Sequence, residues 1–93
     1  MNNNAVSITR TPRFTRNYRA RIRTPQLKKA VVAAIHRFCE DAAAPELRDH
    51  ELRYSMKKLR ALSVTDDVRI VYLRTKKGVI FLDIGTHAQV YQR

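Results

Sequence analysis

The fold is decided by residues 59–86, which read LRALSVTDDVRIVYLRTKKGVIFLDIGT. β-Branched, aromatic and other apolar residues, the types that favour strands, fill three runs of this segment: residues 59–64, 68–74 and 79–86. The two breaks, residues 65–67 and 75–78, contain the polar residues and the glycine that tight turns require. Links this short join antiparallel neighbours, so the segment is predicted to form three antiparallel strands.

Two helices are predicted before this segment. Each begins with a threonine followed by a proline, so that a capping hydroxyl precedes a proline in the first helical position: Thr11-Pro12 and Thr24-Pro25. The first helix has apolar residues at a spacing of four: Phe14, Tyr18 and Ile22. The second has an apolar stripe at spacings of three and four and is expected to extend to about residue 43: Leu27, Val31, Ala34, Ile35 and Phe38.

The remaining segments complete the predicted order β-α-α-β-β-β. A short strand is predicted at residues 5–10, and residues 46–57 are interpreted as an irregular connector. This order predicts an α+β fold in which a helical hairpin packs on one face of a twisted antiparallel sheet, while the other face stays open. A chain of 93 residues buries only about 60% of its extended surface, so we expect a single domain over residues 1–93, with residues 1–4 disordered.

Charge is the strongest compositional feature, since 19 Lys+Arg against 8 Asp+Glu give a net charge of +11. The first 39 residues contain no acidic residue and nine basic ones: Arg10, Arg13, Arg16, Arg19, Arg21, Arg23, Lys28, Lys29 and Arg37. Such a distribution indicates a polyanionic partner, and both a nucleic acid and an acidic protein remain open. The alternative is a solvated basic surface without a specific partner.

Several classes of protein are excluded by the sequence pattern. No run approaches the roughly 18 apolar residues of a membrane span, and residues 1–4 lack the apolar stretch of a secretory signal. We therefore expect no membrane partner and a cytoplasmic location. Cys39 is the single cysteine, which excludes an internal disulfide, and three histidines with one cysteine fall short of a closed zinc pattern. No metal or cofactor site is predicted.

Three residues that are distant in sequence are candidates for acid–base chemistry: His50, Asp67 and His87. All lie at or beyond predicted strand ends on the face expected to be open, and their convergence is a hypothesis. Cleavage of RNA without a metal needs a base for the ribose 2′-hydroxyl, an acid for the departing 5′-oxygen and cations for the phosphorane. Histidine serves as either proton-transfer partner near neutrality, and Arg60 with Arg69 would supply the cations. The alternative interpretation is a loop hydrogen-bonder, a turn former and a strand terminator.

The last predicted strand and the residues after it carry two further expectations. Side chains two apart share a face, so Asp83, Gly85 and His87 are expected on one side and Ile80, Leu82 and Ile84 in the core. A glycine at position 85 either leaves room for a close approach to the backbone or marks a bulge. Tyr91 either stacks on a base of single-stranded RNA or packs the C-terminal segment on the sheet.

Four stretches of the chain resemble the YafQ branch of the RelE/ParE toxins. They are His50-Glu51-Leu52, LRALSV at residues 59–64, DVRIVY at residues 67–72 and IGTHAQVY at residues 84–91. The resemblance covers about residues 47–91, close to half of the chain. The terminal Ile-Gly-Thr-His-x-x-Val-Tyr and the Asp-x-Arg-Ile-x-Tyr strand are its most distinctive parts.

The resemblance implies a bacterial type II toxin with a RelE-like fold. Such a toxin is a ribosome-dependent messenger-RNA endonuclease that a cognate antitoxin holds inactive, and the two proteins together repress their own operon by binding its operator DNA. Residue by residue, His50 and His87 match the catalytic histidines and Asp67 the catalytic acidic residue. Tyr91 matches the aromatic residue near the terminus, and Arg60 a basic position used on the substrate phosphate.

The chain departs from the family pattern at several positions that bear on catalytic rate and codon preference. Ser63 stands where the best-known member of the branch has a histidine, and Val68 stands where an aromatic residue commonly follows the acid. The runner-up function is a non-nucleolytic toxin of the ParE kind that binds DNA gyrase, which has no use for paired histidines. A third reading, a basic RNA- or DNA-binding module, explains the charge but not the C-terminal motif.

Overall fold

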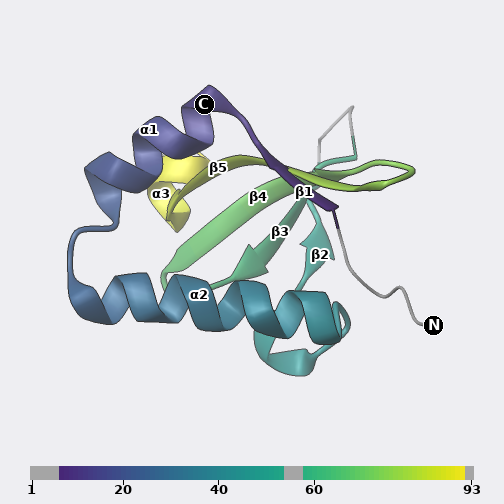
Figure 1. Cartoon of the computed structure of the whole chain (residues 1–93), viewed down its shortest axis with the longest axis horizontal. Coiled ribbons are helices and arrows are strands. Elements are labelled where there is room, and N and C mark those ends of the chain that lie inside the picture. The colour runs from purple at the N-terminus through teal and green to yellow at the C-terminus, as the bar shows by residue number, and fades with distance from the viewer. Residues whose placement is uncertain (1–6, 54–57, 92–93) are drawn as a thin grey trace.

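The computed structural model describes residues 7–53 and 58–91. Its elements follow one another along the chain as labelled in Figure 1: β1 (Ser7–Arg10), α1 (Pro12–Arg21), α2 (Pro25–Glu40), the 3-10 helix η1 (Pro45–Leu47), β2 (His50–Glu51), β3 (Arg60–Ser63), β4 (Val68–Arg74), β5 (Gly78–Thr86) and α3 (His87–Val90). The expected disorder of residues 1–4 lies outside the described residues. None of the helices in the described part is long and apolar enough to cross a membrane.

Both long helices begin at the predicted caps. The side chain of Thr11 accepts a hydrogen bond from the backbone N–H of Phe14, and that of Thr24 accepts one from Leu27, each 3.1 Å long. These bonds satisfy donors that the first helical turn leaves free. Helix α2 ends at Glu40, about three residues before the predicted end, because Asp41 adopts an extended backbone with φ −158° and ψ 93°.

The sheet has the strand order β1-β5-β4-β3-β2. The pairs β2–β3, β3–β4 and β4–β5 are antiparallel, whereas β1 runs parallel to β5, with Ser7 opposite Gly78. The α+β class and the helical hairpin are confirmed, but the expectation of a wholly antiparallel sheet is wrong for β1. The two helices carry the chain back across the sheet after β1, and such a crossover joins parallel strands.

The core lies between the helical hairpin and one face of the sheet (Figure 1). Aromatic rings connect the two layers, since Phe38 of α2 meets Tyr72 of β4 at 5.1 Å between centroids and Phe14 of α1 meets Phe81 of β5 at 5.3 Å. All four rings are almost fully buried. Burial of each large ring stabilises the fold by about 2 to 3 kcal/mol, so these pairs hold α1 and α2 on the sheet.

A bulge in β5 changes which of its side chains enter the core. Val71 lies opposite Asp83 and Tyr72 opposite Phe81, so Leu82 is an extra residue in β5. Odd-numbered residues of β5 face the core before the bulge, and even-numbered residues face it after the bulge. Phe81 and Ile84 therefore both enter the core, whereas Ile80 and Leu82 are only half-buried. The prediction was correct for Ile84 and wrong for Ile80 and Leu82.

The second face of the sheet has no long helix, yet it is not open. Ala61, Ser63 and Val71 alternate with core residues of β3 and β4, so they lie on this second face, and all three are buried. The short helix α3 packs on β4 and β5. This face, called the α3 face below, is therefore partly covered, contrary to the expectation.

Candidate functional site

His50 lies on the edge strand β2, which was not predicted as a strand. It is opposite Ala61 in the register, so its side chain is on the α3 face, and it is exposed. Its ring nitrogen Nδ1 is 2.9 Å from the backbone carbonyl of Arg48. A carbonyl only accepts hydrogen bonds, so Nδ1 carries the proton in this contact. The contact leaves Nε2 to exchange a proton or a hydrogen bond with a ligand.

Asp67 and His87 are adjacent although twenty residues separate them in sequence. The backbone N–H of His87 donates to the backbone carbonyl of Asp67 at 3.0 Å, and both side chains are exposed. The hydroxyl of Thr65 accepts from the N–H groups of Asp67 and Val68, which fixes the turn that presents Asp67. His87 is the first residue of α3, a helix that the sequence analysis did not predict.

Tyr91 forms one wall beside His87. The two rings are 4.4 Å apart between centroids and nearly perpendicular, because a spacing of four residues places them on the same side of the last helical turn. Tyr91 is half-buried, and burial raises the pKa of its hydroxyl, while the nearby charge of Arg69 acts in the opposite direction. Tyr91 thus packs against His87, and its expected role in stacking on a base stays a prediction.

Arg69 is on the α3 face, in β4, which lies between β3 and β5. In the register it lies opposite Ser63 of β3 and Gly85 of β5. Its Nη1 donates to the carbonyls of Thr65 and Asp66 at 3.1 and 2.8 Å, which holds the guanidinium over the turn that contains Asp67. Arg69, Asp67, His87 and Tyr91 therefore form one group, called the α3 cluster below.

Arg60 lies on the opposite face of the sheet, which corrects the expectation that it joins Arg69 on a phosphate. It is paired with the core residue Tyr72, and its Nε donates to Asp49 at 2.8 Å. The Asp49 carboxylate is 6% exposed and also accepts a hydrogen bond from the hydroxyl of Tyr72. Burial and this bond raise the pKa of Tyr72 to about 12. Burial lowers the pKa of Arg60, but its hydrogen bonds to Asp49 and Tyr72 outweigh that effect and raise it.

His50 does not meet the α3 cluster. The register runs from His50 through Ala61 and Val71 to Asp83, so three strand spacings of about 4.8 Å, or roughly 14 Å, separate His50 from β5. Asp67 and His87 are joined through their backbones, whereas His50 shares the face at a distance, and the predicted convergence of their side chains on one substrate stays a prediction. The predicted alternation could not give this separation, because it assigns faces and not the number of strands between residues.

Two further residues reach the α3 face without having been predicted. The Nη1 of Arg21 donates to the carbonyl of Ile84 at 3.0 Å and lies 3.5 Å from the carboxylate of Asp83. Asn17, one turn earlier in α1, donates to the same carboxylate oxygen at 2.7 Å. The only sequence signal is the spacing of four between Asn17 and Arg21, which puts them on one side of a helix.

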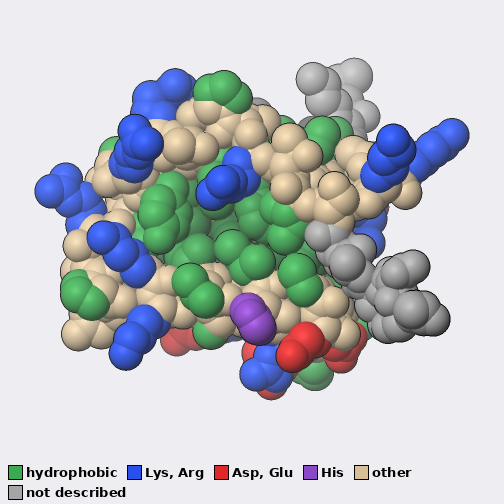
Figure 2. Space-filling view, in the orientation of Figure 1, with side chains coloured by type: hydrophobic (Ala, Val, Ile, Leu, Met, Phe, Trp, Pro, Cys, Tyr) green, Lys and Arg blue, Asp and Glu red, His purple; other side chains and the backbone are tan. Residues whose placement is uncertain are grey.

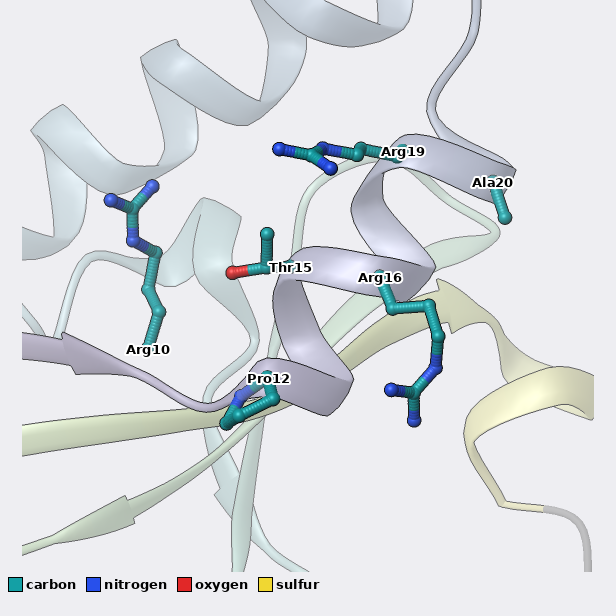
Figure 3. A pocket seen from close by; sticks show the side chains of 6 residues that line it. All are labelled: Arg10, Pro12, Thr15, Arg16, Arg19 and Ala20. Atoms are coloured by element: carbon teal, nitrogen blue, oxygen red, sulfur yellow. The ribbon is translucent and has the colours of Figure 1, made fainter.

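A basic hollow lies on the outer side of α1, away from these contacts. It encloses about 730 Å³ and is lined by Arg10, Pro12, Thr15, Arg16, Arg19 and Ala20. Figure 3 shows that Arg10 and Arg19 extend toward the same side of Thr15, while Arg16 extends to the other. None of its three arginines has an ion-pair partner among the described residues. Figure 2 shows hydrophobic side chains between α1 and α2, with Lys and Arg around them.

The described residues contain no group of three or more His, Cys, Asp or Glu side chains that could hold a metal ion. The candidate site is thus made of two histidines, one carboxylate, one tyrosine and the guanidinium groups that reach the α3 face.

Comparison with known proteins gives a family and several structural relatives. A sequence model of a family described as "Bacterial toxin of type II toxin-antitoxin system, YafQ" matches residues 6–92. A search of curated protein sequences gave no match. The match extends the resemblance, which the sequence motifs had placed at about residues 47–91, over nearly the whole chain.

Solved structures share the fold at low sequence identity. YafQ in the E. coli DinJ-YafQ complex has a TM-score of 0.77 at 20% identity, over 92% of this chain and 98% of that one. A metal-bound toxin from Helicobacter pylori has a TM-score of 0.74 at 19% identity, over 92% and 99% of the two chains. YoeB from Staphylococcus aureus, solved as a dimer, has a TM-score of 0.69 at 13% identity, over 88% and 97%.

Proposed function

Because the chain belongs to the YafQ family of bacterial type II toxin–antitoxin toxins, we propose that it cleaves messenger RNA on the ribosome without a metal ion. The observation that carries this proposal is the α3 cluster. It joins the backbones of Asp67 and His87 by a hydrogen bond, so that a residue with a carboxylate and one with an imidazole stand on neighbouring chain segments, at the turn where the guanidinium of Arg69 is held. These are the three kinds of group that the cleavage of a ribose phosphodiester requires.

The reaction moves two protons. A base takes the proton of the ribose 2′-hydroxyl, and the 2′-oxygen bonds to phosphorus as the bond from phosphorus to the 5′-oxygen breaks. An acid protonates the departing 5′-oxygen, so the products are a 2′,3′-cyclic phosphate and a 5′-hydroxyl. Asp67 and His87 are the pair that exchanges these protons, and Arg69 stabilises the negative charge that develops on the phosphate oxygens. Tyr91 packs nearly perpendicular to the His87 ring and, in this proposal, also contacts a base of the RNA.

His50 has a different part in this proposal. Its distance of roughly 14 Å from β5 exceeds the reach of one phosphodiester, so it contacts the same RNA strand at another nucleotide. Ser63 lies between the two positions, in the same register row as Arg69. Ser63 is buried. It stands where the best-known relative has a further histidine, so this chain has no imidazole between His50 and His87.

Mapping of message ends on purified ribosomes tests the function. His87→Gln is expected to slow cleavage by about 10² to 10⁴, the usual contribution of one proton transfer, and His50→Gln is expected to slow it less. His36→Gln is the matched control, because His36 is an exposed histidine on α2. A chelator that leaves the ribosomes intact should have no effect. Wild-type cleavage by His87→Gln, or inhibition of gyrase without any effect on translation, would contradict the proposal.

An acidic antitoxin is the partner expected at the basic hollow of α1. Arg10, Arg16 and Arg19 repel one another, and acidic side chains from a partner would remove that repulsion. The hydrophobic side chains between α1 and α2 would receive the apolar side of the same segment (Figure 2). The DinJ-YafQ complexes support such a partner, since there a relative with the same fold is bound to a second protein. Contact with operator DNA would then occur through the complex.

A further inference from the structure

We propose that Arg21 of α1 is a phosphate-binding residue of the RNA-cleavage site, on the same face of the sheet as Arg69. The proposal rests on the function proposed above and extends it to a helix that the sequence analysis did not connect with the site. Arg21 thereby takes the part that the sequence had assigned to Arg60, which lies on the other face of the sheet.

The path of α1 brings Arg21 to the end of β5. Helix α1 starts beside the middle of β5, where Thr11 donates its backbone N–H to the carbonyl of Phe81 at 3.1 Å. It then follows β5 to its last turn, where Nη1 of Arg21 donates to the carbonyl of Ile84 at 3.0 Å. Figure 1 shows α1, the end of β5 and α3 gathered at one side of the molecule.

Gly85 shows which face of the sheet the guanidinium occupies. A Cβ atom at this position would lie 2.7 Å from Nη1 of Arg21 and 2.7 Å from Oε1 of Gln89 in α3. Gly85 is opposite Arg69 in the register, and opposed residues of an antiparallel pair share a face. The guanidinium of Arg21 therefore lies on the α3 face, over the same glycine that Arg69 flanks from the other strand. His87 follows two residues later.

The guanidinium of Arg21 is oriented by an ion pair with Asp83, and this pair is long. Asp83 accepts short hydrogen bonds on the same carboxylate oxygen from Asn17 (2.7 Å) and from the N–H of Ile84 (2.8 Å), whereas Arg21 is 3.5 Å away. Within the described part of the chain, every recorded contact of Arg21 uses Nη1. The side chain is 25% exposed, and in this proposal Nε and Nη2 form the fork that binds two phosphate oxygens.

Two guanidinium groups on one face of the sheet, one against Gly85 and one at the turn that contains Asp67, form a fitting site for a phosphodiester. The glycine at position 85 lets Nη1 of Arg21 lie against the backbone of β5, in space that a larger residue would fill. Negative charge grows on the phosphate oxygens as the phosphorane forms, and pre-positioned donors stabilise it more than they stabilise the substrate. The proposal thus gives one cation to each side of the scissile phosphate.

Cleavage on ribosomes is the first readout. Arg21→Ala should lower kcat by about 10² to 10³, as loss of one such donor does elsewhere, with little change in the ribosome concentration at half-maximal rate. Arg21→Lys should give an intermediate rate, because it keeps the charge and loses the fork. Added guanidinium ions should restore part of the activity of Arg21→Ala. Arg13→Ala is the matched control, since Arg13 is exposed on the same helix and has no ion pair among the described residues.

Titration of the wild-type chain with inorganic phosphate, followed by NMR of the arginine Nε–H groups, is the second readout and needs no cleavage. The signals of Arg21 and Arg69 should shift together and saturate, and that of Arg13 should not. If the wild type leaves messages intact, the proposed function fails, and this titration still decides the role of Arg21. Unshifted Arg21 signals overturn the inference. Wild-type kcat in a folded Arg21→Ala, or a loss that added guanidinium does not rescue, overturns it as well.

Discussion

At the scale of single residues, the decisive contrast is between two arginines on opposite faces of one sheet. Arg60 and Arg69 both come from strand runs that the sequence predicted correctly, and both were expected at the phosphate. The register separates them, because Arg60 faces Asp49 and Tyr72 in the core layer whereas Arg69 faces the α3 cluster. Their roles follow from this difference: Arg60 neutralises a buried carboxylate, and Arg69 remains available to a ligand.

Replacement of Arg60 by alanine should therefore affect stability more than chemistry. It leaves the carboxylate of Asp49, only 6% exposed, without its cation, and breaking a buried pair in this way costs about 3 kcal/mol. The exposed pair of Arg37 with Glu46 is the control, because its loss costs less than about 1 kcal/mol. Urea unfolding measures both free energies. Cleavage by the folded Arg60→Ala chain should match the wild type, and a loss as large as that of Arg69→Ala would return Arg60 to the site.

Tyr72 gives the fold a sensitivity to alkaline pH. Burial and the bond to Asp49 raise its pKa to about 12, above the value of about 10 for an unfolded chain. The stabilising effect is complete below pH 10 and disappears as the pH rises to about 12, because the unfolded chain loses the proton first. Two pKa units correspond to about 3 kcal/mol of unfolding free energy. Tyr72→Phe should be less stable at neutral pH, by about 1 to 3 kcal/mol, and should lose less stability between pH 10 and 12.

At the scale of elements, the sequence predicted the parts that local chemistry determines. Threonine and proline fixed the starts of α1 and α2, and three apolar runs gave β3, β4 and β5. No local pattern in the sequence indicates the bulge at Leu82, because an apolar residue fits this position with or without a bulge. Strand β2 is two residues long and helix α3 four, so neither contains a full period of its pattern. His50 and His87 lie on these two elements, which is why their separation could not be predicted.

Helix α3 depends on one capping arrangement for its position. Thr86 accepts from the N–H of Gln89 at 3.2 Å, and Gln89 accepts from the N–H of Thr86 at 2.8 Å. Thr86→Ala should cost about 1 kcal/mol of stability and should also reduce cleavage, because His87 begins this helix. Thr24→Ala removes the equivalent cap of α2, far from the site, at a similar cost. Equal cleavage by the two variants, measured on ribosomes at equal folded fractions, would show that α3 does not position His87.

At the scale of the whole molecule, the two proposed tasks belong to different sides. The α3 face holds the acid–base groups with Arg21 and Arg69, while the outer side of α1 carries the basic hollow of Arg10, Arg16 and Arg19. Net charge alone indicated a polyanionic partner and left a nucleic acid and an acidic protein open. Two separate basic regions allow both partners, one on each side of α1.

Charge reversal at the hollow should weaken antitoxin binding without slowing cleavage. The double variant Arg10→Glu/Arg19→Glu alters two side chains that extend to the same side of the hollow (Figure 3). We expect affinity for the acidic antitoxin to fall at least about tenfold, mainly through slower association. The control Lys76→Glu/Lys77→Glu makes the same change in net charge at the exposed β4–β5 turn. Calorimetry and stopped-flow mixing measure both steps, and equal affinities for the two variants would place the antitoxin elsewhere.

The parallel pairing of β1 with β5 affects how the chain folds during its synthesis. Ser7 pairs with Gly78, and Arg21 pairs with Asp83. An N-terminal segment, which is synthesised first, therefore makes these contacts only after β5 has been synthesised. Contacts this remote in sequence close late and slow folding. The sheet and the contacts of Arg21 can therefore form only after residues 78–84 have left the ribosome.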